Sequence, residues 1–124
     1  MYRDTEAVAH GASLLVRELH AVLIVAWTEY GNIARLLSKC RLPVPIVALS
    51  PDEHICRRTS MFYGVLPGCT PRTADHFAMA ADVDRWLLQR RLVEPGDLIV
   101  LIPGSRLDRE GATNALLVHL VGRS

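Results

Sequence analysis

Seven consecutive apolar residues, Ala21 to Trp27, place the strongest constraint on the fold of this chain. The run is too short to cross a bilayer, which needs about 20 apolar residues in a helix. It is typical of a β-strand that is buried on both faces, because a strand with one solvated face alternates apolar and polar residues. Such a strand lies at the centre of a sheet that has helices on both sides. The run therefore predicts an α/β fold.

Helical and strand patterns alternate along the rest of the sequence, which is typical of a mostly parallel sheet. The expected helices cover about Thr5–Leu19, Asn32–Cys40, Ser50–Phe62 and a long stretch from Thr70 with the buried stripe Met79, Val83, Trp86 and Leu87. The further expected strands are Ile46–Leu49, the region around Val65 and Leu66, Leu98–Ile102 and Asn114–Val121. No helix separates the last two strands, so the final strand is expected to pair antiparallel at an edge.

The segment Ser50-Pro51-Asp52-Glu53 carries the clearest local signal for a helix start. Ser50 is expected as the N-cap and Pro51 as the first helical residue. Glu53 would then complete a capping box with Ser50.

The length, net charge and cysteine content limit the number of domains, the partners and the cellular compartment to be expected. The 124 residues suit a single domain, expected to span residues 1–124. A formal net charge of +1 gives no general attraction to nucleic acid or to anionic membranes, so neither is expected as a partner. Three widely spaced cysteines predict no zinc or redox motif and fit a reducing compartment. Without an apolar signal core near the start, we expect a cytoplasmic protein.

The sequence shows no catalytic or metal-binding motif. The five histidines form no HxH or HExxH pattern, and no nucleophile elbow, Walker loop or dinucleotide fingerprint is present. Asp82 and Asp84 lie two apart on an expected helix and so point in different directions. Cys56 falls inside an expected helix, where little would lower the pKa of its thiol. We therefore predict no catalytic residue, no metal and no cofactor.

Ligands of open α/β sheets bind beyond the carboxyl ends of the strands, where three segments qualify: Thr28–Ile33, Ser50–Glu53 and Pro103–Gly111. In the turn Thr28 to Ile33, Gly31 stands where a helix begins, and backbone N–H groups at a helix start attract anions. In the loop Pro103 to Gly111, two arginines are suited to phosphate. The same residues also fit a plain turn and a solvated loop whose arginines pair with Asp108 and Glu110.

An ordered set of motifs resembles the C-terminal α/β domain of pyruvate kinase. The matching segments cover essentially the whole chain: Glu6–Val25, Thr28–Arg41, Pro45–Ala48, Pro51–Glu53, Gly64–Pro67, Gly96–Val100 and Gly111–Asn114. The resemblance implies a three-layer α/β/α fold with a mixed, mostly parallel five-stranded sheet whose last strand is antiparallel. It also implies a non-catalytic domain, because the catalytic barrel of the family has no counterpart in this sequence.

The resemblance further implies two roles. One is homo-oligomer contact, expected here through the last strand, Ala115 to Val121, and the adjacent helix. The other is binding of a phosphorylated effector, such as a sugar phosphate or a nucleoside monophosphate. The expected effector-binding residues are Thr28, Tyr30, Gly31, Asn32, Ile33, Arg106, Arg109 and Gly111.

Two positions depart from the family pattern. Tyr30 and Ile33 stand where the family commonly has hydroxyl side chains around the glycine. An interaction domain with a degenerate pocket is therefore one alternative function. A small enzyme acting on a phosphorylated metabolite at the same strand ends is another.

Overall fold

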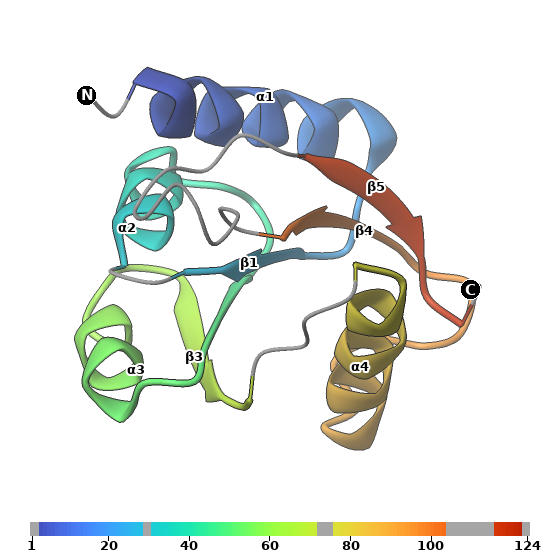
Figure 1. Ribbon diagram of the computed structural model, residues 1–124. Helices are drawn as coiled ribbons and strands as arrows, with labels where there is room; N and C mark the ends of the chain where they lie inside the picture. The colour runs from blue at the N-terminus through green and yellow to red at the C-terminus, as the bar shows by residue number, and fades with distance from the viewer. Residues whose placement is uncertain (1–2, 29–30, 72–75, 104–115, 123–124) are drawn as a thin grey trace.

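The computed structural model describes residues 3–28, 31–71, 76–103 and 116–122 of the chain (Figure 1). Its helices are α1 (Arg3–Leu19), α2 (Asn32–Lys39), α3 (Glu53–Thr59) and α4 (His76–Gln89). Its strands are β1 (Ile24–Trp27), β2 (Ile46–Ser50), β3 (Val65–Cys69), β4 (Leu98–Ile102) and β5 (Leu117–Leu120). Among these residues, none of the helices has the length and apolar character that a membrane span requires.

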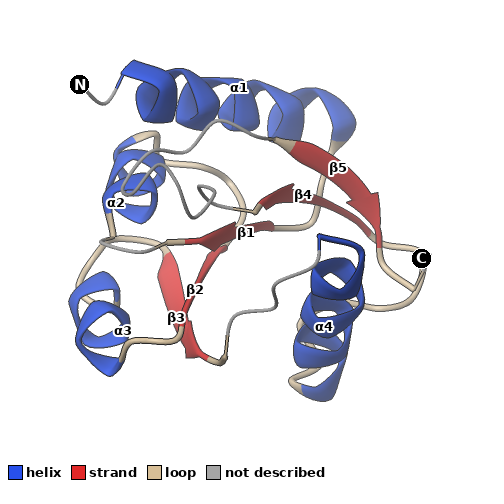
Figure 2. Ribbon diagram, viewed as in Figure 1, coloured by secondary structure: helices blue, strands red, loops and turns tan. Residues whose placement is uncertain are grey.

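The five strands form one sheet in the order β3-β2-β1-β4-β5 (Figure 2). β1 is the central strand and pairs in parallel with both β2 and β4. β5 pairs antiparallel with β4, with Val118 opposite Val100. The predicted mixed sheet with an antiparallel last strand is confirmed, and the apolar run supplies its centre.

Helices cover both faces of the sheet, so β1 is buried on each side. Ile24 and Ala26 pack on the face covered by α1 and α2, whereas Val25 and Trp27 pack on the face covered by α4. α3 packs against β2 and β3. This double burial is the reason that every residue of β1 is apolar.

The predicted start of α3 is wrong by two residues. Ser50 remains the last residue of β2, where it lies in register with Cys69 of β3. The Asp52 side chain instead accepts a hydrogen bond from the His54 N–H at 2.8 Å and is the N-cap. Ser50 Oγ accepts from the Asp52 N–H, so it shapes the turn that precedes the helix. Pro51 consequently lies outside the helix.

Other boundaries differ from the expected ones by a few residues. β1 begins at Ile24 rather than Ala21, α3 ends at Thr59 rather than Phe62, and β3 continues to Cys69. In α4 the side chains of Met79, Val83 and Leu87 are buried as predicted, while Trp86 is only partly buried. The start of the predicted last strand lies outside the described residues.

Candidate functional site

The turn that follows β1 is built around a left-handed glycine. Gly31 has φ 89° and ψ 1° and is the N-cap residue of α2. A positive φ strains any residue with a Cβ, so this position requires glycine. The Gly31 N–H donates to Thr28 Oγ1 at 2.7 Å, and the Thr28 N–H donates to the Leu49 carbonyl at 3.0 Å. Thr28 is thereby buried and held within the loop.

The described part of the expected effector site has little open surface. Ile33 is 2% exposed and packs in the core on the α1 face of the sheet. Asn32, the first residue of α2, is partly buried. Gly31, the N-cap residue of α2, has no side chain to cap the helix. The other expected effector-binding residues lie outside the described residues: Tyr30, Arg106, Arg109 and Gly111.

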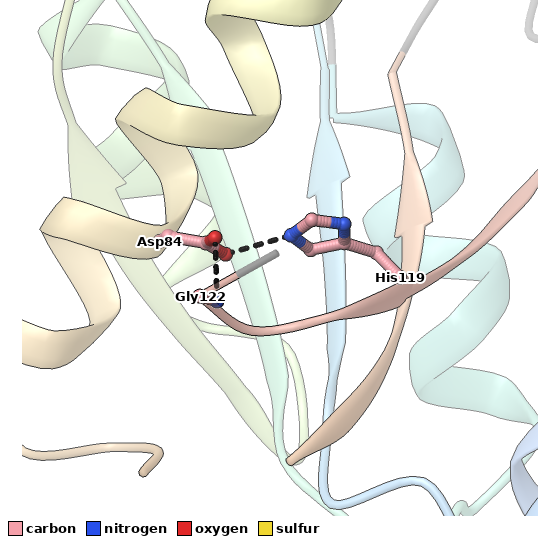
Figure 3. A network of polar contacts seen from close by, with 3 residues as sticks. All are labelled: Asp84, His119 and Gly122. Atoms are coloured by element: carbon pink, nitrogen blue, oxygen red, sulfur yellow. Dashed lines mark hydrogen bonds and ion pairs between the residues drawn. The ribbon is translucent and has the colours of Figure 1, made fainter. Parts of the chain in front are cut away.

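A buried carboxylate ties α4 to the last strand, as Figure 3 shows. Asp84 Oδ1 lies 2.9 Å from His119 Nε2, and Asp84 Oδ2 accepts a hydrogen bond from the Gly122 N–H at 2.9 Å. The two side chains are 12% and 13% exposed. The sequence predicts a helix that contains Asp84 and a strand that contains His119, but it does not predict their contact. No local signal links residues 35 positions apart, so only the sheet topology brings them together.

The outer edge of β5 is apolar and open. Leu117, Val118 and Leu120 are 45%, 48% and 38% exposed, and Leu14 of α1 is 51% exposed. The β4–β5 register places Val118 on the same face as α1, because its partner Val100 packs there. Leu116, which precedes β5, packs on the same face, and a Cβ on Gly11 of α1 would lie 3.5 Å from its side chain.

The Cys56 thiol is unreactive, as the sequence predicts. Its pKa is raised from 9.0 to about 11, first by burial and then by a hydrogen bond with the Cys69 side chain. A thiol with that pKa is almost wholly protonated at neutral pH and is a poor nucleophile. Within the described ranges, no group of three or more His, Cys, Asp or Glu side chains is arranged to hold a metal ion.

Comparison with known proteins identifies the family. The family model described as pyruvate kinase, alpha/beta domain, matches residues 6–119. Pyruvate kinase of Agrobacterium vitis is 35% identical over 117 residues, which cover 94% of this chain and 24% of the relative. Pyruvate kinase of Methylorubrum extorquens is 30% identical over 119 residues, covering 96% of this chain and 25% of the relative.

A solved structure supports the fold. The crystal structure of a pyruvate kinase from Cryptosporidium parvum superposes with a TM-score of 0.84 at 23% identity. The match covers 98% of this chain and 23% of that one. This chain thus spans about a quarter of the length of these relatives. With nearly all of its sequence matched by one family model, the chain belongs to the pyruvate kinase alpha/beta domain family.

Proposed function

We propose that this chain is a non-catalytic assembly and regulatory domain that pairs with a second copy of itself through β5 and the adjoining flank of α1. The observation that carries the proposal is the apolar, open outer edge of β5. This chain matches only the alpha/beta domain of its relatives, which supports a non-catalytic role. The proposal includes a cytoplasmic location, in keeping with the three free cysteines.

The two edges of the sheet differ in a way that favours pairing at β5. An unprotected edge strand offers N–H and C=O groups to another strand, and natural proteins block this with charged residues or proline. β3, at one edge, contains Pro67, which has no N–H to donate. β5, at the other edge, contains no Asp, Glu, Lys or Arg, and the side chain of His119 contacts Asp84. Its exposed leucines and valine would be covered by a second copy.

Sedimentation velocity across a dilution series tests this assembly. The wild-type chain is expected to be a dimer that dissociates on dilution. Val118→Arg places a charge on the apolar edge and should shift the chain to monomer. Leu66→Arg is the matched control, because Leu66 is 41% exposed on β3 at the opposite edge. A wild-type monomer at all concentrations, or equal effects of both variants, would contradict the proposal.

A phosphorylated effector is the regulatory part of the proposal. The N-terminus of α2 supports it, since its N-cap residue Gly31 has no side chain and backbone N–H groups at a helix start favour an anion. Thr28, Gly31 and Asn32 would form the phosphate side of the site beside Tyr30 and Ile33. Arg106, Arg109 and Gly111 would close it, because arginine binds phosphate in a bidentate manner.

Thermal unfolding with sugar phosphates and nucleoside monophosphates tests effector binding, with inorganic phosphate as a control. A ligand at a hundred times its Kd adds about 2.7 kcal/mol to the free energy of unfolding. We expect a selective rise in Tm that is lost in the Arg106→Ala/Arg109→Ala variant. No rise with any compound, or an unchanged rise in that variant, would contradict the assigned residues. Neither result would affect the assembly test.

A further inference from the structure

Two cysteines from different elements meet at the carboxyl end of β3. Cys69 is the last residue of β3, in register with Ser50 of β2, and Cys56 belongs to α3, which packs against both strands (Figure 1). Cys56 Sγ donates to the Ser50 carbonyl at 3.5 Å. Cys69 Sγ donates to the carbonyl of the next residue, Pro51, at 3.7 Å. The two thiols therefore converge on one turn, and they share a hydrogen bond with each other.

The turn between β2 and α3 does not depend on the two thiol hydrogens. A thiol is only a weak hydrogen-bond donor, so its removal from a carbonyl costs little. The Ser50 carbonyl also accepts a hydrogen bond from the Thr70 N–H at 3.0 Å, which involves no sulfur. A bond between the two sulfur atoms would thus leave the backbone hydrogen bond at this turn in place.

The two thiols differ in exposure and in how readily they ionise. Cys69 is exposed, whereas Cys56 is partly buried. Burial, followed by the contact with Cys69, raises the pKa of Cys56 to about 11, so Cys56 does not attack a reagent in solution at neutral pH. It reacts only with a sulfur atom held against it, where proximity offsets its small thiolate fraction. Cys69 is therefore the thiol that reacts first.

We propose that Cys56 and Cys69 form a reversible disulfide when the chain meets a small-molecule disulfide such as oxidised glutathione. The Cys69 thiolate attacks one sulfur of that molecule, which forms a mixed disulfide and releases one glutathione thiolate. Cys56 then loses its proton to solvent, and its sulfur attacks Cys69 Sγ and displaces the second glutathione thiolate. Two electrons pass from the cysteines to the oxidant, and two protons end on the released thiolates. In a reducing compartment such a bond is transient and senses the redox state.

The disulfide would fasten α3 to the edge strand β3. It closes the loop from residue 56 to residue 69, which holds the end of α3 and all of β3. Closing a loop of about 15 residues removes conformational freedom mainly from the unfolded chain. The folded chain should therefore be oxidised more readily than the unfolded chain, because its two thiols are already in contact. This bond involves neither β5 nor the turn from Thr28 to Ile33.

A redox titration with mixtures of reduced and oxidised glutathione tests the proposal. After acid quenching, mass spectrometry of the intact chain and its peptides gives the fraction that has lost two hydrogens and the position of the bond. The midpoint is the ratio of the squared concentration of reduced glutathione to the concentration of oxidised glutathione at half-oxidation. We expect a Cys56–Cys69 bond and a midpoint at least about tenfold higher in native buffer than in concentrated urea. A bond elsewhere, no bond, or a native midpoint at or below that in urea would overturn the proposal.

Three serine variants, each close in shape to the native cysteine, assign the roles of the thiols. Cys56→Ser should stop at the mixed disulfide on Cys69, and Cys69→Ser should leave the protonated Cys56 thiol largely unmodified. Cys40→Ser is the matched control and should be oxidised like the wild type. Cys40 follows α2, which leads back to the start of β2 and so ends at the opposite end of the parallel strands. Equal modification of Cys56 and Cys69 in the first two variants, or loss of the bond in Cys40→Ser, would refute these roles.

Discussion

Replacement of Asp84 by alanine tests whether a single carboxylate fastens the last strand to α4. Both carboxylate oxygens are used, one at 2.9 Å from His119 Nε2 and one accepting from the Gly122 N–H at 2.9 Å. A hydrogen bond to a charged group contributes about 1.5–3 kcal/mol. Because His119 keeps some access to water at 13% side-chain exposure, its lost bond is partly replaced by solvent. We therefore expect Asp84→Ala to lower the free energy of unfolding by about 3 kcal/mol.

Urea titration followed by far-UV circular dichroism measures this loss at neutral pH. For a domain of this size, about 3 kcal/mol corresponds to a fall in Tm of about 10 °C. Glu18→Ala is the matched control, because Glu18 is an exposed carboxylate on α1 and should contribute no more than about 1 kcal/mol. The double variant Asp84→Ala/His119→Ala should be less destabilised than the sum of the single variants. Equal, small losses for Asp84→Ala and Glu18→Ala would refute the reasoning.

Three further predictions concern local packing, capping and a titrating thiol. Gly68→Ala should cost about 1–3 kcal/mol in urea titrations, since its Cβ would clash with Trp86 and Leu49, and Trp86→Leu should reduce that cost. Asp52→Ala should cost about 1 kcal/mol through loss of the α3 N-cap, whereas Asp52→Asn should be nearly neutral in the same assay. The raised pKa of Cys56 means that the folded state keeps this proton longer than the unfolded state. Stability should therefore fall as pH rises from about 9.0 to 11, and Cys56→Ala should flatten that fall in urea titrations across this range.

The turn from Thr28 to Ile33 shows which structural details a sequence motif does not predict. The glycine at position 31 indicated a strand-to-helix turn, and its positive φ agrees with that expectation. The sequence did not indicate that Thr28 Oγ1 accepts the hydrogen bond of the Gly31 N–H. That bond depends on how the turn closes after β1, so it is a property of the folded loop.

The fold class followed from sequence alone because burial on both faces of a central strand leaves a local signature, the apolar run that contains β1. The helical periodicity of apolar residues predicted the alternation of helices and strands along the chain. The absence of a helix between the last two strands predicted that the final strand is antiparallel. Other features depend on distant residues. The connection through α4 leads from β3 at one edge of the sheet to β4 on the other side of β1. Only this connection brings Asp84 to His119 and packs Trp86 against Gly68. It also places Pro67 and Val118 at opposite edges of the sheet. Such contacts have no periodicity along the chain, and the tertiary structure alone decides them.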